Sequence, residues 1–349
     1  MISNHNEDAV GIWTPRNDDD VDTIPAVSAL VPRSLDLATR ALPQRGSFTE
    51  GLKGLGLDWS VSKHQLWRQV GVGPQGRPQM RAAENTFEVR RDDTLAMLGV
   101  VGRRYETVQN SAMTKSLDEI FSGQLAGMAT LERGGGFDGG ATVYMQAALP
   151  PNLTRALFKG ADVIAPYLAF TTSHDGSSAL RVFPTAVRVI CQNTLRMAIS
   201  GERKAKAGWT FRHTRKAASA QAQMTAVLRE SARAYVEHMD RMQTMASASI
   251  TASKVKVLIA DEILLGEDTP AKRRKVQTIV DLVDNGRGTE IPGVRGTRYG
   301  VFQAVTEFAN HYAPVSRALP APDAAARRLE RVLFDHVDFV ERAEAVLLR

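Results

Sequence analysis

Alternation of apolar and polar residues is the dominant pattern in the first half of the chain. It recurs over residues 59–70, 86–91 and 95–109, as it does in half-buried strands. The clearest hairpin joins residues 128–133 to 141–149 around the glycine-rich loop GGGFDGG. Because short turns rather than long helical crossovers separate these runs, they predict an antiparallel sheet.

Two further strands are expected at 167–173 and 179–190, on either side of a His-Asp-Gly-Ser turn. Pro184 lies within the second strand and has no N–H to donate, which predicts a bulge or an edge position. Short helices are expected in three places: at 117–121, at 153–158, and from Asn193-Thr194, which can cap a helix.

The second half of the chain has helical periodicity. Residues 209–265 contain neither glycine nor proline, and one apolar face of a long helix carries Met224, Leu228, Tyr235, Met239 and Met242. The small, polar segment 247–253 predicts an interruption of this helix. Further helices are expected at 256–265, 299–311 and 324–348, and the glycine-rich segment 285–300 interrupts this region.

These patterns predict an α+β fold: a largely antiparallel, curved sheet with hairpins, followed by a long helix and a helical C-terminal region. We divide the chain into an acidic, proline-rich arm without regular structure (1–50), a sheet-rich α+β core (51–207) and a helical region (208–349). The helical region is expected to pack on the core or on a neighbouring subunit. Residues 1–22 carry six acids against Arg16, which fits a solvated tail or an arm that covers basic residues elsewhere.

Composition limits the class of protein. Of 349 residues, 43% are hydrophobic and 23% charged, as in a folded domain. The sequence has no apolar run of about 18 residues and no recognisable secretory signal, so we expect a cytoplasmic protein without a membrane partner. Cys191 is the only cysteine, which excludes an internal disulfide and a CxxC zinc site. No phosphate-binding loop is present, and we expect neither cofactor nor metal.

Charge is distributed unevenly along the chain. Residues 176–229 hold ten Lys or Arg and one acid, a net of +9 in a chain whose total is +6. Aromatic side chains lie among these cations, and that combination suits a single strand, because cations bind phosphates and flat rings stack on bases. The alternative is that Trp209 and Phe211 are core residues. The candidate nucleic-acid contacts are Arg103, Arg104, Arg188, Arg196, Arg203, Lys204, Lys206, Trp209, Phe211, Arg212, His213, Arg215 and Lys216.

Acidic residues near the strands offer a second possibility. A metal-dependent nuclease needs carboxylates that converge on its ions. The candidates are Asp92, Asp93, Glu106, His174 and Asp175. The simpler interpretation is that most of them are turn residues whose side chains bond to nearby backbone. We therefore assign no catalytic residue and expect a binding protein rather than an enzyme.

Four segments resemble one known family. They are RRDDTLAMLGVVGRRYETVQN (90–110), TSHDGSSALR with RVICQNTL (within 172–195), FRHTRK (211–216) and TRYGVFQAVTEFANH (297–311). They resemble the phage/plasmid-like protein family, a domain of unknown function found on plasmids, prophages and phages. The resemblance implies a context of mobile DNA. A weaker, fold-level similarity is to phage single-strand annealing proteins, which bind a strand in a basic groove and assemble into rings or filaments.

The expected function is non-catalytic binding of single-stranded nucleic acid, DNA more than RNA, and strand annealing in replication or recombination of a phage or plasmid. The protein is expected to form a homo-oligomer, a ring or a filament. Two alternatives are a metal-dependent nuclease and a structural or host-interaction protein that does not bind nucleic acid.

Overall fold

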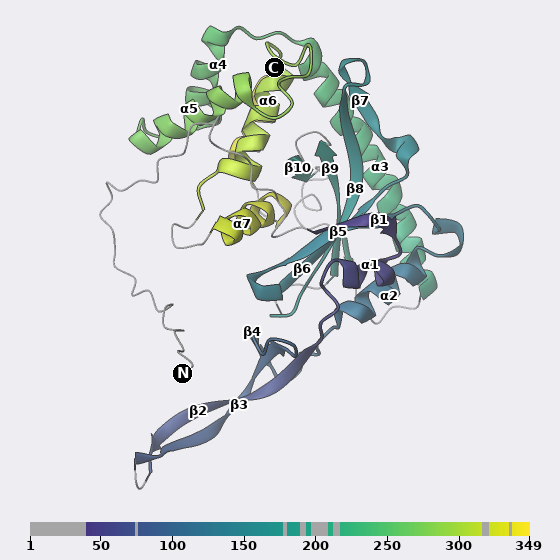
Figure 1. The fold of residues 1–349 in the computed structure, drawn as a ribbon, viewed down its shortest axis with the longest axis vertical. Coiled ribbons are helices and arrows are strands. Elements are labelled where there is room, and N and C mark those ends of the chain that lie inside the picture. Colours follow the sequence, from purple (N-terminus) through teal and green to yellow (C-terminus); the bar gives the residue numbers. More distant parts are fainter. Residues whose placement is uncertain are drawn as a thin grey trace, which may run out of the picture.

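The fold is that of a computed structural model, which describes residues 40–73, 76–176, 180–188, 193–196, 209–211, 217–315, 321–334 and 337–349. Within these residues an antiparallel eight-stranded sheet lies between helices, and a smaller three-stranded sheet extends from it (Figure 1). The helices concentrate in the C-terminal half. The expected α+β class is therefore confirmed.

The larger sheet is built from hairpin-linked strands. Its main path is β1-β5-β6-β8-β9-β10, while β7 pairs with β8 and β11 pairs with β9. The expected hairpin is β5 with β6, and the GGGF of its glycine-rich loop belongs to β5. The strands are β1 (Arg40–Gly46), β5 (Thr130–Phe137), β6 (Thr142–Ala148), β7 (Arg155–Leu157), β8 (Asp162–Ser173), β9 (Leu180–Arg188), β10 (Asn193–Arg196) and β11 (Trp209–Phe211).

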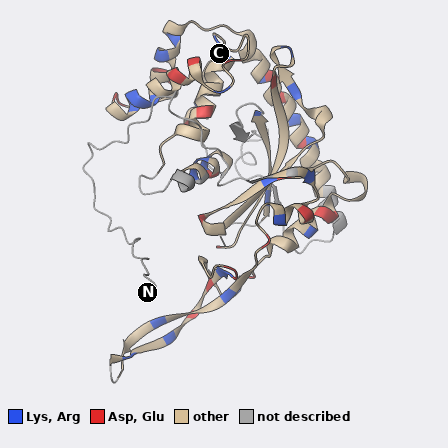
Figure 2. Ribbon diagram, viewed as in Figure 1, with Lys and Arg blue, Asp and Glu red and all other residues tan. Residues whose placement is uncertain are grey.

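The smaller sheet carries a long hairpin. Its strands are β2 (Val61–Val72), β3 (Pro78–Arg91) and β4 (Met97–Gly102), in the order β2-β3-β4. Because β4 pairs only with Thr86–Arg90 of β3, the rest of the hairpin is a two-stranded ribbon. We call residues 66–73 and 76–83 the β-arm. It projects away from the rest of the protein (Figure 1), and Figure 2 shows basic residues, all of them Arg, on both of its strands.

A bulge marks the base of the β-arm. Gln65 faces Phe87 across the hairpin, whereas Trp67 faces Ala82, so several residues of β3 lie opposite a single residue of β2. The side chain of Gln65 fills this irregularity, and its Nε2 donates to the carbonyl oxygen of Ala83 at 2.7 Å. Bulges bend the strand and increase its twist, which turns the ribbon away from the three-stranded part.

Helices cover both faces of the larger sheet. One face is covered by α1 (Phe48–Gly54), α2 (Asn110–Ile120) and the first part of α3 (Ala217–Ser247), and the other by α7 (Ala321–Phe334). In β8, Leu168 and Phe170 pack with α1 and α2, while Ala169 between them packs with Leu329 and Leu333 of α7. Successive residues of a strand point to opposite faces. Because both faces of β8 are covered, this strand requires a nearly continuous run of apolar residues.

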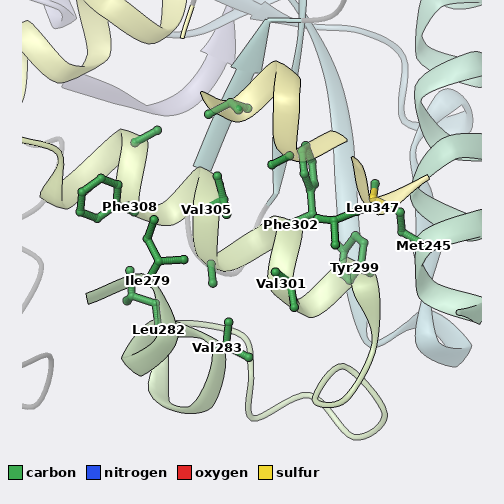
Figure 3. Packing of buried hydrophobic residues seen from close by; sticks show 14 of the residues in the cluster. Met245, Ile279, Leu282, Val283, Tyr299, Val301, Phe302, Val305, Phe308 and Leu347 are labelled. Atoms are coloured by element: carbon green, nitrogen blue, oxygen red, sulfur yellow. The ribbon is translucent and has the colours of Figure 1, made fainter. Parts of the chain in front are cut away.

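Helix α3 connects the sheet to the helical region. Met224 packs with the sheet cluster, whereas Tyr235, Met239 and Met242 pack with the C-terminal helices. The predicted apolar face of this helix is therefore buried within the chain. Figure 3 shows the second cluster, in which Val301 and Val305 lie on the side of Ile279 and Leu282, whereas Phe302 lies beside Leu347. The helices here are α4 (Ala252–Leu258), α5 (Pro270–Asn285), α6 (Arg298–Glu307) and α8 (Asp338–Leu347), with π-helical turns at Ile259–Ile263 and Phe308–Tyr312.

The interruption predicted at 247–253 is confirmed, because α3 ends at Ser247 and α4 begins at Ala252. The glycine-rich interruption is also present, since α5 ends at Asn285 and α6 begins at Arg298. The last expected helix, 324–348, is instead two helices, α7 and α8. Within the described residues no helix is long and apolar enough to cross a membrane.

Two predicted helices are strands. Residues Arg155–Leu157 form β7 on the edge of β8, and Asn193–Arg196 form β10 on the edge of β9. In both cases a sheet edge supplies the hydrogen-bond partners, and this outweighs local propensity, because isolated segments of four to six residues are too short to hold a helix. Conversely, the strand expected over 95–109 covers only Met97–Gly102, and α2 begins at Asn110 rather than 117.

The boundary placed at residue 50 is too late. β1 pairs with β5, and Phe48 and Leu52 are buried in the sheet cluster. Ser47 caps α1, since its side chain accepts a hydrogen bond from the Glu50 N–H. The folded part therefore includes residues from Arg40 onward, and the acidic residues 1–22 lie outside the described residues.

Tyr235 provides a test of the contact between α3 and the sheet. Its hydroxyl donates to the carbonyl oxygen of Ile164 at 2.6 Å and accepts from the Arg155 N–H at 2.8 Å. Tyr235→Phe keeps the ring and leaves a buried carbonyl and a partly buried N–H without this partner, so we expect the free energy of unfolding to fall by about 1–3 kcal/mol. Urea unfolding measures it, with Met242→Leu, a volume-conserving change in the same cluster, as the control. Equal stabilities of Tyr235→Phe and the native protein would contradict the described contact.

Candidate nucleic-acid interface

Strand β9 anchors the basic stretch. β10 and β11 pair with the same edge of β9, because β8 occupies the other edge. Arg196 faces Thr185 and Trp209 faces Val182, so the two ends of segment 197–208 are held about 10 Å apart along this edge. Pro184 pairs with Leu168 of β8 and falls in the gap between β10 and β11 on its other side. The proline thus lies within the sheet, at a point where neither β10 nor β11 pairs with it and requires its missing N–H.

The candidate contacts fall into three groups. Arg196, Trp209 and Phe211 are placed by the backbone of β10 and β11, next to β9. Arg103, Arg104 and Arg188 lie in described parts of the chain with their side chains. The remaining candidates lie outside the described residues; they are Arg203, Lys204, Lys206, Arg212, His213, Arg215 and Lys216.

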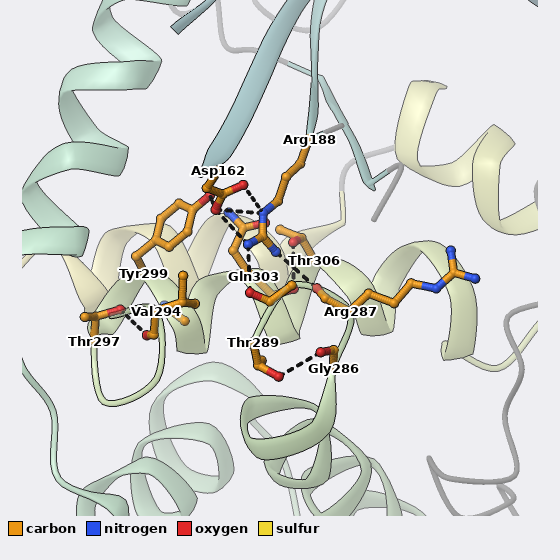
Figure 4. Close-up of polar contacts among 12 residues, drawn as sticks. Asp162, Arg188, Gly286, Arg287, Thr289, Val294, Thr297, Tyr299, Gln303 and Thr306 are labelled. Carbon is orange, nitrogen blue, oxygen red and sulfur yellow. Dashed lines mark hydrogen bonds and ion pairs between the residues drawn. The ribbon is translucent and has the colours of Figure 1, made fainter. Parts of the chain in front are cut away.

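Arg188 is not at the surface, and this corrects its assignment as a nucleic-acid contact. Its side chain is 3% exposed and forms a bidentate pair with Asp162, which is fully buried. The Nε–Oδ1 and Nη2–Oδ2 distances are 2.8 Å and 2.7 Å (Figure 4). A guanidinium held in this way is unavailable to a phosphate. A buried carboxylate needs such a partner, because an unpaired charge in the interior is strongly unfavourable.

The same pair joins the sheet to the helical region. Tyr299 of α6 donates its hydroxyl to Asp162 Oδ2 at 2.8 Å, and Arg188 donates to the carbonyl oxygens of Arg287 and Gly288, each at 3.3 Å. Gly288 has φ +90°, and a Cβ there would lie 2.6 Å from the guanidinium. Only glycine therefore allows the backbone to approach so closely. We call Asp162, Arg188, Tyr299 and Gly288 the junction cluster.

Glu307 lies beside the junction cluster. Its side chain is buried and accepts a hydrogen bond from the Arg287 N–H at 3.2 Å. Burial raises the pKa of Glu307 to about 7, although this N–H and the nearby arginines oppose the shift. The pocket between β8, β9 and α6 that Arg188, Gln303 and Thr306 help to line has a volume of about 20 Å³, enough for one water molecule. This junction is therefore a packed contact, not a ligand site.

Arg103 and Arg104 are exposed at the end of β4. Lys63 holds their turn in place, because its Nζ donates to the carbonyl oxygen of Arg103 at 3.0 Å. The adjacent β4 backbone packs on the turn that precedes β9: a Cβ on Gly99 would lie 2.6 Å from Asp175 Cβ. The structure therefore brings these two arginines to the point where the basic stretch begins.

Three of the nuclease candidates, Asp92, Asp93 and His174, are held by local contacts. Ser60 and Ser62 donate to Asp92, and these hydrogen bonds lower its pKa. Asp93 pairs with Arg91 at 2.6 Å. His174 is buried, its Nε2 lies 3.0 Å from Asn110 Oδ1, and burial lowers its pKa to about 4. In the described part of the chain, no three His, Cys, Asp or Glu residues are grouped closely enough to hold a metal ion.

The β-arm is a candidate surface that is not among those predicted from the sequence. Trp67, Arg68 and Arg81 are exposed on a ribbon to which the described residues add no third strand. The signal was present in the sequence, since residues 65–83 contain three arginines and no acid around a central turn. These residues were not interpreted as an exposed hairpin, because the alternation over residues 59–70 predicts a half-buried strand.

Replacement of Arg188 distinguishes a structural role from a phosphate contact. Arg188→Ala leaves Asp162 buried without its charge partner, so we expect the free energy of unfolding to fall by about 3–5 kcal/mol. The matched control is Arg181→Ala in the same strand, which is partly exposed and is expected to change stability by less than about 0.5 kcal/mol. Denaturant unfolding of both variants measures the difference. Similar small effects of the two changes would contradict the buried pair.

Glu307 predicts a pH dependence of stability. A carboxyl group with a folded-state pKa of about 7 and an ordinary value of 4.5 favours folding below pH 4.5, and this contribution is lost as the pH rises through 7. Glu307→Gln removes it. The stability of the variant relative to the native protein should therefore increase by about 3 kcal/mol between pH 4.5 and pH 8. Unfolding at the two pH values measures the change, and a difference that stays constant with pH would refute it.

Comparison with curated proteins found no match, and comparison with solved structures also found none. One family profile does match, over residues 97–333, well over half of the 349 residues. The match includes β4, the larger sheet from β5 onward and the helices through most of α7, but not the β-arm. The chain therefore belongs to the family described as a domain of unknown function, DUF932.

Proposed function

We propose that the protein binds single-stranded nucleic acid, DNA in preference to RNA, without catalysing a reaction. The observation that carries this proposal is the concentration of positive charge in residues 176–229. The buried Arg188 is subtracted, because Asp162 already pairs with it. Nine cations then remain against Glu202, a net of +8. A solvated surface would mix both signs of charge, so this excess favours a polyanionic ligand.

The arrangement of the described strands supports a local surface. Segment 197–208 leaves and rejoins the edge of β9 within about 10 Å. Segment 212–216 connects β11 to α3, and the exposed Arg103 and Arg104 lie near the turn before β9. Described strands on the edge of β9 thus flank both basic segments, and Arg103 and Arg104 follow the strand that packs on the turn before β9. Phosphate contacts of this kind bind without base preference and weaken steeply as salt increases.

The biological setting follows from the resemblance to phage/plasmid-like proteins. We propose that the protein acts in the cytoplasm on mobile DNA, in replication or recombination, and that it forms rings or filaments on the strand. Binding of two strands along such an assembly would permit annealing. This setting and the assembly are supported by family resemblance and fold-level similarity, whereas strand binding itself is supported by charge.

Charge reversal tests the proposal directly. Arg212, Arg215 and Lys216 changed together to Glu should abolish binding of a single-stranded oligonucleotide, because phosphate attraction becomes repulsion. Changing them to Ala should instead lower the slope of log affinity against log salt by about 0.7 for each lost phosphate contact. The matched control reverses Lys254, Lys256 and Arg295, which are exposed in the helical region and alter net charge equally.

Fluorescence anisotropy at several salt concentrations measures both effects. If the two charge-reversed proteins bind equally well, the basic stretch is not the interface. If the native protein fails to bind any oligonucleotide, the proposed function is wrong. Degradation of the oligonucleotide that requires magnesium would identify a nuclease instead.

A further inference from the structure

The β-arm has two different faces. Pairing in the hairpin places Arg68 directly opposite Arg81, and both are exposed. Their neighbours Trp67 and Met80 point to the other face, because side chains alternate along a strand. One face of the ribbon is therefore cationic, and the other is aromatic and apolar.

The cationic face is unfavourable in the free protein. Like charges directly opposite each other in a sheet are destabilising, and within the described residues neither Arg68 nor Arg81 has an acidic partner. The ribbon is also two-stranded, a form that is only marginally stable in water without a further contact. Residues 65–83 contain Arg68, Arg77 and Arg81 but no acid. An anion held between the two arginines would remove the repulsion.

The other face exposes large apolar side chains. Trp67 is 59% exposed, Val72 66% and Met80 51%. An indole ring that is this open presents a flat surface on which an unpaired base can stack. Residues 66 to 72 of the free ribbon span about 20 Å, and the ribbon that carries this surface projects away from the larger sheet (Figure 1).

We propose that the β-arm is a second contact surface for single-stranded nucleic acid. Arg68 and Arg81 bind its phosphates, and Trp67 stacks on one of its bases. The choice of single-stranded nucleic acid as the ligand rests on the proposed function. The choice of the β-arm as its binding surface does not, because the β-arm lies outside the basic stretch. A two-stranded ribbon can also enter the major groove of a duplex, but paired bases offer Trp67 only their edges. A second β-arm is also disfavoured as the partner, because the β-arm contains no acid and two cationic faces would repel each other.

Trp67 tests the stacking contact. Trp67→Ala should weaken binding of an oligothymidine by about 5- to 160-fold, the range for loss of one stacked base. Trp67→Phe retains an aromatic face and should lose much less. Both variants should bind a duplex of equal length with unchanged affinity. Anisotropy titrations of the full-length protein at one salt concentration provide all of these comparisons.

The arginine pair gives a test that a purely structural role cannot mimic. Arg81→Ala relieves the repulsion from Arg68, so the thermal midpoint should stay the same or rise while single-strand affinity falls. The double change Arg68→Ala with Arg81→Ala should lower the salt slope by about 1.4, or 0.7 for each phosphate. The matched control is Lys254→Ala with Arg295→Ala, two exposed cations of the helical region, and its salt slope should be unchanged.

Several results would overturn the proposal. If the native protein and the Trp67 and arginine variants all bind a single strand with equal affinity, the β-arm is not a contact surface, and the proposed function is unaffected. Equal losses on duplex and single strand would exclude base stacking. If the Trp67 or arginine variants change the oligomer mass of the free protein, as measured by mass photometry, but keep their affinity for the strand, the partner of the β-arm is a second copy of the chain. Failure of the native protein to bind any strand would refute both proposals.

Discussion

The buried ion pair between Arg188 and Asp162 is the contact on which the arrangement of the molecule depends. The two charges come from neighbouring strands of the larger sheet, and Tyr299 and two backbone carbonyls of the helical region complete their hydrogen bonds. Charges removed from water are tolerated only when their partners are all in place. Sheet and helical region must therefore assemble together, and the junction cluster fixes β9 relative to both.

The position of β9 determines where the remaining positive charge lies. Its free edge receives β10 and β11, so the basic segments are attached to a rigid central strand. Arg188 itself is a component of the interior, whereas Arg68 and Arg81 of the β-arm face each other in water. Arg188 thus already has its counter-charge in Asp162, whereas the repulsion between Arg68 and Arg81 would be relieved by an external anion.

The sequence predicts those parts of the fold in which local pattern and burial agree. The β5–β6 hairpin and the apolar face of α3 follow from periodicity, because each element buries one defined set of side chains. Strand β10 could not be predicted, because Asn193-Thr194 is typical of a helix cap and nothing in the local sequence shows that the segment pairs with the edge of β9. Arg188 was assigned to the surface because a buried arginine depends on Asp162, 26 residues earlier. Trp67 was missed because its exposure follows from the missing third strand.

Photo-crosslinking of the full-length protein to a single-stranded oligonucleotide, followed by peptide mapping, tests the central claim most directly. Single-strand binding through two cationic surfaces predicts adducts in residues 65–83, especially at Trp67, and in residues 197–216. It also predicts none at Arg188, which is buried beside Asp162. The adducts should decline together as salt increases, because both surfaces bind phosphates. Adducts confined to the C-terminal helices, or their complete absence under conditions of low salt, would contradict the claim.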